Sequence, residues 1–440
     1  MVASLERQHL DALSEGSVRL GPLEAVDGVR GYPPESGLLP DPEPRTVNYT
    51  VISVDDHLIE PGNMFQGRLP AKLQDRAPHV VTTPEGDEVW EFEGKRYNEV
   101  ALNANAGRRF SKPGDEPKRY DQIRRGCYDV HARVSDMDIN GVWASMNFPS
   151  RITGFCGTVY AMCTDRELGL ATMRAWNDWM FEEWYSPYPD RIIPLGLTYM
   201  TDPKEGAKEI RRNAERGFRA VSMPERPQCI GLPSLFSGYW DPIVEACADT
   251  DTAISLHAGN TGVYDLGDVS AGGNYASDHL GLGIAHARLE VGLALFPQLA
   301  LCAATEWLFS GYPARFPSIK ITLAEGGIGW VAMLLDRLDQ MIDRRGIQNR
   351  FSERPSEMLK RNFWFCTIED PSTIDTRYRI GVENIMVEVD FPHSDGTWPD
   401  TQCAIEEAMG HLPAEELRAI CCENAARVFR HPLPPVVLPR

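Results

Sequence analysis

Several apolar, strand-like runs of the sequence end in a histidine or an acidic residue. The residues at these ends are Asp55 with His57 in VISVDDHLIEP, His257 in TAISLHAG, Glu325 in IKITLAEGG and Asp390 in NIMVEVDFP. Side chains alternate along a strand, so Asp55 and His57 share one face while Asp56 points to the other. A carboxylate and an imidazole on one face can bind the same metal ion.

Each of these residues also has a plainer explanation, because a polar side chain at a strand end is often only hydrogen-bonded in a loop or caps the next helix. Their number favours a shared site, since the strands of a parallel barrel all end on one face. We expect four ligands to bind one Zn²⁺ or Mn²⁺ and to leave positions open for water and substrate, namely Asp55, His57, His257 and Asp390. The predicted catalytic residues are Asp390, Glu325 and His257, with Glu325 as a general acid or base or a further metal contact.

Five more residues are candidates for substrate contact or for support of the metal ligands. They are Glu60, His279, His286, His393 and Trp398. The glutamate lies just beyond the first strand, where it can orient a metal ligand or the substrate. The first two histidines lie in a glycine-rich loop, where ordinary hydrogen bonds within a lid would also explain them. Core packing is the alternative role for the tryptophan.

The order of the elements predicts how these side chains are brought together. Eight runs resemble buried parallel strands, and amphipathic helical patterns such as 167–185 and 203–217 separate many of them. The runs cover residues 46–54, 142–148, 191–200, 218–223, 252–259, 319–327, 363–368 and 384–392. Strands separated by helices predict βαβ units, and eight of them predict an α/β fold of the closed (β/α)8, or TIM barrel, type.

The ends of the chain and two internal segments depart from this alternation. The division that we expect is a Pro-rich extension over 1–45, a barrel over 46–432 with insertions near 80–126 and 259–285, and a tail over 433–440. The first insertion contains EVWEFEGKRYNEV, a predicted hairpin that turns at Glu93 and Gly94. The extension is expected to lie on a partner subunit, which makes a homodimer the expected assembly.

The composition of the chain indicates which binding partners and which cellular location to expect. The 440 residues include 44 Lys and Arg against 63 Asp and Glu, a formal net charge of −19. This balance argues against binding to nucleic acid or to an anionic membrane surface, and a small-molecule substrate is expected. We find no apolar run that could span a membrane or act as a signal, and the ten cysteines have no disulfide or zinc spacing. Reduced thiols in a cytoplasmic protein are therefore expected.

At VDDHLIEP, SLHAG, LAEGGIGW and VDFPHSDGTWP the sequence resembles the amidohydrolase superfamily. Within it, the chain is similar to the amidohydrolase-2 branch, which includes aminocarboxymuconate semialdehyde decarboxylase and γ-resorcylate decarboxylase. The resemblance implies a distorted (β/α)8 barrel with one divalent metal ion, because the lysine that bridges two ions has no evident counterpart. It assigns Asp55 and His57 to the ligand pair of the first strand, His257 to the fifth and Asp390 to the eighth. Glu325 departs from it, since several decarboxylases of the branch have a proton-transferring histidine here.

Three functions fit these residues, and the resemblance favours the first. In non-oxidative decarboxylation, the metal holds the carboxylate of a small aromatic or unsaturated substrate, Asp390 protonates the carbon, and carbon dioxide leaves. In hydrolysis, the metal lowers the pKa of a water, Asp390 takes its proton, and an amide, lactone or carbon–carbon bond is attacked. The third function is a barrel that binds a ligand without turnover. The sequence leaves the substrate, and the choice between lyase and hydrolase, open.

Overall fold

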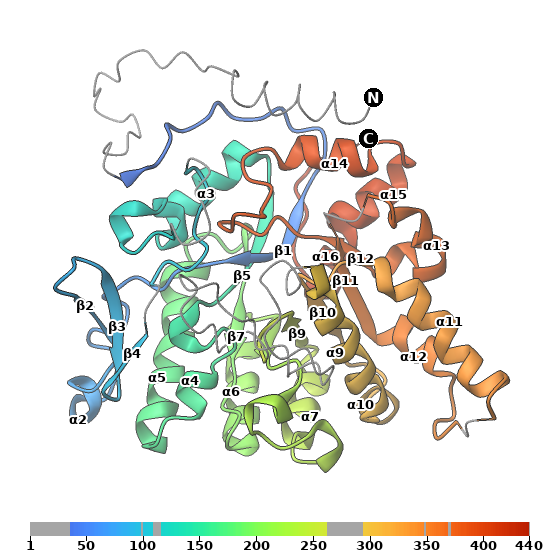
Figure 1. Ribbon diagram of the computed structural model, residues 1–440, viewed down its shortest axis with the longest axis horizontal. Helices are drawn as coiled ribbons and strands as arrows, with labels where there is room; N and C mark the ends of the chain where they lie inside the picture. The colour runs from blue at the N-terminus through green and yellow to red at the C-terminus, as the bar shows by residue number, and fades with distance from the viewer. Residues whose placement is uncertain are drawn as a thin grey trace.

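A parallel sheet forms the core of the protein (Figure 1). The computed structural model describes residues 36–97, 100–108, 116–261, 294–346, 349–367 and 371–439. The strands of the sheet are β1 (Ile52–His57), β5 (Ala144–Phe148), β6 (Ile192–Ile193), β7 (Leu195–Leu197), β8 (Ala220–Met223), β9 (Ala253–His257), β10 (Ile321–Ala324), β11 (Phe363–Thr367) and β12 (Ile385–Val387). Each of the eight predicted runs contains at least part of one of these strands.

The sheet closes on itself at Pro194. Its order of neighbours is β6, β5, β1, β12, β11, β10, β9, β8 and β7. β6 pairs with β5 and β7 pairs with β8, and only Pro194 separates β6 from β7, so both ends of this order belong to one stretch of chain. Proline interrupts the ladder there because it has no N–H. Counting β6 and β7 as one, the sheet has the eight strands of a (β/α)8 barrel, which confirms the predicted fold.

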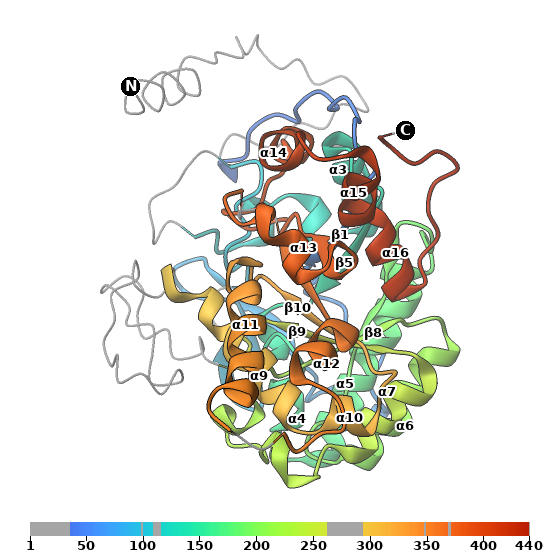
Figure 2. The ribbon, with the colours of Figure 1, turned by 90° about the vertical axis from the view of Figure 1, so that its right-hand side faces the viewer.

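Helices follow the strands and cover the outside of the barrel (Figures 1 and 2). The longer helices are α3 (Val130–Asn140), α5 (Arg166–Trp179), α6 (Pro203–Glu215), α7 (Asp241–Thr250), α9 (Pro297–Phe309), α11 (Gly329–Asp343), α12 (Pro355–Asn362) and α14 (Thr401–Met409). The shorter ones are α2 (Ala71–Gln74), α4 (Thr158–Ala161), α10 (Tyr312–Arg315), α13 (Arg377–Ile380), α15 (Ala414–Arg418) and α16 (Asn424–Phe429). The carboxylates of Asp129, Asp165 and Asp202 cap α3, α5 and α6 by accepting hydrogen bonds from N–H groups of the first turn. The predicted helical patterns over 167–185 and 203–217 correspond to α5 with its π-helical continuation, and to α6.

The first insertion forms a separate antiparallel sheet at the left edge of Figure 1. Its strands are β2 (His79–Thr82), β3 (Glu88–Phe92) and β4 (Lys95–Tyr97). Glu93 and Gly94, between β3 and β4, have φ values of 49° and 72°. Two successive residues with positive φ are typical of the tight turn that matches strand twist. The predicted hairpin is thus confirmed.

The described part of the N-terminal extension packs on its own barrel. Asp41 forms an ion pair with the buried Arg124 at 2.7 Å, and Arg45 forms one with Asp400 at 2.8 Å. Farther along, the Thr50 N–H donates to the carbonyl of Leu438 at 3.1 Å, so the C-terminal tail lies beside the entry to β1. These contacts within one chain were not anticipated from the sequence, and the homodimer stays a prediction.

Among the described residues, no helix is long and apolar enough to cross a membrane. All ten cysteines lie in the described ranges, and each is a free thiol. Most of them are buried, so they pack as small apolar side chains. The cytoplasmic location stays a prediction.

Candidate metal centre

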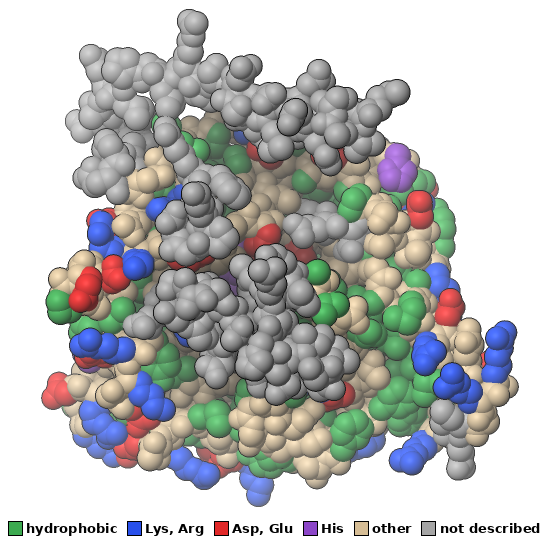
Figure 3. All heavy atoms as spheres, viewed as in Figure 1, with side chains coloured by type: hydrophobic (Ala, Val, Ile, Leu, Met, Phe, Trp, Pro, Cys, Tyr) green, Lys and Arg blue, Asp and Glu red, His purple; other side chains and the backbone are tan. Residues whose placement is uncertain are grey.

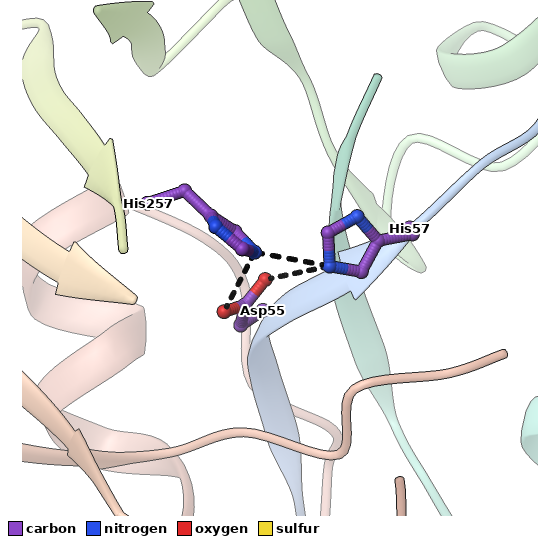
Figure 4. Close-up of side chains that lie close together, drawn as sticks. All are labelled: Asp55, His57 and His257. Carbon is purple, nitrogen blue, oxygen red and sulfur yellow. Dashed lines mark hydrogen bonds and ion pairs between the residues drawn. The ribbon is translucent and has the colours of Figure 1, made fainter. Parts of the chain in front are cut away.

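Asp55, His57 and His257 meet at the carboxyl ends of β1 and β9 (Figure 4). The Nε2 atoms of the two histidines lie 3.1 Å apart. The carboxylate of Asp55 faces both, with one oxygen 3.6 Å from Nε2 of His57 and the other 3.7 Å from Nε2 of His257. One ligand atom from each residue lies within 4.8 Å of the other two, a spacing that can hold a metal ion. The structure thus brings three of the four predicted ligands to one point.

Asp390, in the turn after β12, lies close to His57. Its Oδ1 lies 3.2 Å from Nε2 of His57, and its N–H donates to the carbonyl of Asp55 at 2.8 Å. Asp390 belongs to two further groups of ligand atoms within 4.8 Å, one with His57 and His393 and the other with Glu325 and Asp395. The three groups share members, so they form one continuous cluster of acids and imidazoles.

The residues present fit a divalent cation. Asp55 is fully buried, and neither of its carboxylate oxygens has a hydrogen-bond partner. A buried carboxylate without donors is costly, and a cation would remove that cost. Nδ1 of His257 lies 2.7 Å from the carbonyl of Ala258, which places its proton there and leaves the lone pair on Nε2. The imidazoles of His57 and His257 with Asp55 and Asp390 are a donor set that suits Zn²⁺ or Mn²⁺.

Burial sets the protonation of these groups. It lowers the pKa of His57 well below its ordinary range and that of His257 to about 4, so both rings are neutral and able to bind metal at neutral pH. Burial, followed by the charge of Glu388, raises the pKa of Asp55 well above its usual value. It also raises the pKa of Asp390 to about 7. A bound cation would favour the ionised carboxylates that burial alone disfavours.

Glu325 lies on the His257 side of the cluster. Its Oε2 is 3.2 Å from Nε2 of His257, and its N–H donates to Oε2 of Glu388 at 2.9 Å. Glu325 and Asp390 both adopt positive φ, 52° and 55°, where the chain turns at the end of a strand. This conformation costs a non-glycine residue on the order of 1 kcal/mol and often occurs at functional sites. The surrounding structure must therefore hold Glu325 and Asp390 in this conformation.

His393 contacts both Asp390 and His57. Its Nδ1 lies 2.9 Å from Oδ1 of Asp390, and its ring stacks on that of His57 with centroids 3.8 Å apart. Burial lowers the pKa of His393, but the carboxylate of Asp390 outweighs this effect and the net shift is upward. His393, predicted only as a supporting or substrate-binding residue, therefore lies within reach of a metal ion.

Two acidic residues of the cluster were not among the predicted site residues. Glu388 is buried two positions before Asp390, and strand alternation in VEVD could have placed it on the same face. Asp395 follows in an exposed turn, where no periodic pattern distinguishes it. The face of the molecule in Figure 3 has Asp and Glu side chains in the recess near its centre.

The other predicted residues have different surroundings. Glu60 is buried, and its carboxylate accepts hydrogen bonds from the Ser150 hydroxyl and from Nε1 of Trp176 at 2.9 Å, so it fastens the chain after β5. Trp398 donates from Nε1 to the carbonyl of Asp136 at 3.1 Å. Its ring lies under the guanidinium of Arg124, 4.3 Å from the centroid, which is a packing role. His279 and His286 lie outside the described residues.

Acids and histidines at the strand ends of a (β/α)8 barrel are an arrangement that metal-dependent enzymes use. The family model described as "Amidohydrolase" matches residues 160–431, more than half of the chain. The chain therefore belongs to this family, in its amidohydrolase-2 branch. The match includes His257, Glu325 and Asp390 but not β1, so the ligand pair of β1 rests on the structure and on the motif. No curated protein matches the sequence.

Solved structures share the fold at low sequence identity. An amidohydrolase from Mycobacterium avium subsp. paratuberculosis K-10 aligns with a TM-score of 0.67 and 21% identity, covering 87% of this chain and 100% of that one. 5-Carboxyvanillate decarboxylase from Sphingomonas paucimobilis aligns with a TM-score of 0.59 and 20% identity, over 87% and 100%. A dihydroxybenzoic acid decarboxylase from Polaromonas sp. JS666, with bound manganese and the inhibitor 2-nitroresorcinol, gives 0.56 and 16%, over 87% and 97%.

Proposed function

We propose that this protein is a metal-dependent decarboxylase that releases carbon dioxide from a small carboxylated aromatic or unsaturated substrate. The observation that carries the proposal is the buried Asp55 carboxylate, without hydrogen-bond donors, facing two neutral imidazoles at the barrel mouth. Two of the similar structures are decarboxylases of hydroxylated benzoates, and one of these contains manganese. They support the direction of the proposal, while their low identity leaves the substrate to experiment.

Asp55, His57, His257 and Asp390 would hold one Zn²⁺ or Mn²⁺. When bound, the ion supplies a positive charge that orients the substrate carboxylate and a neighbouring oxygen, and that stabilises negative charge developing in the ring or chain. Asp390 would carry a proton to the carbon that loses carbon dioxide. His393, 2.9 Å away, is placed to return a proton to Asp390.

Glu325 would act beside His257. Its carboxylate stands 3.2 Å from Nε2 of His257, in the position where decarboxylases of the branch have a histidine. A carboxylate there can bind the hydroxyl hydrogen of a phenolic substrate or serve as an acid or base. Several decarboxylases of the branch have an imidazole at this strand end. In this chain His393, in the turn after β12, would supply an imidazole instead.

Hydrolysis of an amide, a lactone or a carbon–carbon bond is the second candidate. Asp390 could serve it as well, as the base that accepts a proton from water. The two reactions differ in what leaves the substrate. Carbon dioxide appears only in the first.

The experiment uses the full chain loaded in turn with Mn²⁺ and Zn²⁺. It is incubated with carboxylated phenols, including 5-carboxyvanillate and 2,6-dihydroxybenzoate, and separately with lactones, amides and β-diketones. We expect carbon dioxide and decarboxylated product in equal amounts from at least one phenol, and no release by Asp390→Asn. Hydrolytic products without carbon dioxide would favour the second candidate. A metal-loaded protein that converts nothing in either set would support a ligand-binding barrel.

A further inference from the structure

A buried arginine, Arg133, contacts the backbone of the metal centre. It comes from α3 and is 1% exposed. Its Nε donates to the carbonyl of Gly126 at 2.7 Å, and its Nη2 donates to the carbonyl of His57. Its guanidinium lies over the ring of Phe391, 4.4 Å from the centroid. Arg133 therefore contacts one proposed ligand and the residue that follows another.

Asp56 supplies the opposite charge at the same place. It is 2% exposed, and its Oδ1 accepts from the N–H of Phe391 at 2.9 Å and from the hydroxyl of Ser53 at 3.1 Å. The hydroxyl of Ser145, on the neighbouring strand β5, donates to Oδ2. Asp56 thus points away from the metal cluster, as strand alternation predicts, and its donors are hydroxyls and a backbone N–H.

These contacts converge on the seam between β1 and the chain that leaves β12. The N–H of His57 donates to the carbonyl of Phe391 at 2.6 Å, and the N–H of Asp390 donates to the carbonyl of Asp55 at 2.8 Å. Arg133 donates to the carbonyl of His57, and Asp56 accepts from the N–H of Phe391. One buried cation and one buried anion thus hold the backbone beside the ligands His57 and Asp390.

We propose that Arg133 and Asp56 are positioning residues of the metal centre, which fix the separation and orientation of His57 and Asp390 so that both meet one ion. The inference rests on the metal site of the proposed function but not on its reaction. Removing two charged groups from water is costly, and burial of such groups is weak evidence for stability. Two buried charged groups placed at the ligand seam therefore have their clearest use in setting ligand geometry. Partners of metal ligands commonly change metal affinity by 10 to 100 fold.

Residues that only stabilise the fold would behave differently when substituted. Their loss would lower the unfolding midpoint of the metal-free protein and leave the affinity for metal unchanged. Arg377 provides a matched control in this respect. Like Arg133, it is a buried arginine that lies over an aromatic ring, that of Tyr378 at 4.3 Å. It forms an ion pair with Glu416 and is on α13 away from the cluster.

The test measures the Kd for Mn²⁺ by calorimetry on metal-stripped full-length protein, together with the unfolding midpoint. The variants are Arg133→Gln, Arg133→Lys, Asp56→Asn and the control Arg377→Gln. We expect Arg133→Gln and Asp56→Asn to weaken Mn²⁺ binding about tenfold or more. Arg133→Lys should recover part of the affinity, because it keeps the charge but not the forked donors. Arg377→Gln should lower the midpoint and keep the wild-type Kd.

Folded Arg133 and Asp56 variants that bind Mn²⁺ as tightly as the wild type would overturn the proposal. If Arg133→Gln does not fold, Arg133→Lys and Asp56→Asn decide by the same criterion. Wild-type protein that binds neither Mn²⁺ nor Zn²⁺ would overturn the proposed function and this inference together. Wild-type protein that binds metal tightly but releases no carbon dioxide would overturn decarboxylation alone.

Discussion

Nε2 of His57 and Nε2 of His257 face each other at 3.1 Å, although 200 positions separate the two residues in the sequence. Both rings are neutral because burial disfavours the imidazolium form. The Nδ1 proton of His257 is held by a carbonyl, so Nε2 presents a lone pair to the space that it shares with Asp55. Lone pairs and a carboxylate directed at one point are stabilised together by a cation.

Removing the ion should lower stability. Treatment with a chelator is expected to decrease the unfolding midpoint, and Mn²⁺ or Zn²⁺ at 100 times its Kd should restore about 2.7 kcal/mol. Asp55→Ala should show no such response to added metal. Thermal unfolding of both proteins, with and without metal, measures it. Identical wild-type midpoints under the two conditions would contradict a resident ion.

The alternation of β1 gives Asp55 and Asp56 different roles. Asp55→Ala should abolish bound metal, because its carboxylate lies between the two histidines. Asp56→Asn should still carry about one ion per chain at saturating metal, since Asp56 points to Ser53 and Ser145. Elemental analysis of the two purified variants measures the difference. Metal loss in Asp56→Asn with full retention in Asp55→Ala would reverse the assignment.

Asp390 should be needed for turnover more than for metal. Asp390→Asn keeps the shape of the side chain but removes the group that gives or takes the proton, so kcat should fall roughly 10²- to 10⁴-fold. Metal content at saturation should remain measurable, because three other ligands are unchanged. Steady-state kinetics with metal analysis tests this, and a variant with wild-type kcat would exclude the role.

Glu225, just after β8, should make stability depend on pH. It is 1% exposed, and burial raises its pKa from 4.5 to about 7, although Gly259 and Thr261 donate hydrogen bonds to it. The folded pKa lies above the unfolded one, so its contribution is fully present below about pH 4.5 and is lost as the pH rises through 7. The loss amounts to about 3 kcal/mol.

Glu225→Gln cannot titrate, so its stability relative to the wild type should increase between pH 5 and pH 8. Urea unfolding of both proteins across this range gives the comparison. Parallel stability curves for the two proteins would show that the carboxyl group of Glu225 is not responsible.

The strand ends could be predicted because apolar runs and two-residue alternation are local patterns. Asp55 and His57 share a face for this reason, and the parallel barrel brings His257 and Asp390 to the same end. The partners of Glu60 could not be predicted, since Ser150 and Trp176 are distant in sequence and only tertiary packing brings them together. The stacking of His393 on His57 depends in the same way on how the turn after Asp390 folds.

Anomalous diffraction from crystals of the Mn²⁺-loaded protein tests the central claim most directly, because it locates the ion itself. The account predicts one strong peak roughly 2 Å from a carboxylate oxygen of Asp55, from Nε2 of His57 and His257, and from Oδ1 of Asp390. A peak coordinated by Glu325, Asp390 and Asp395 without either histidine would contradict it. So would a saturated protein with no peak between His57 and His257.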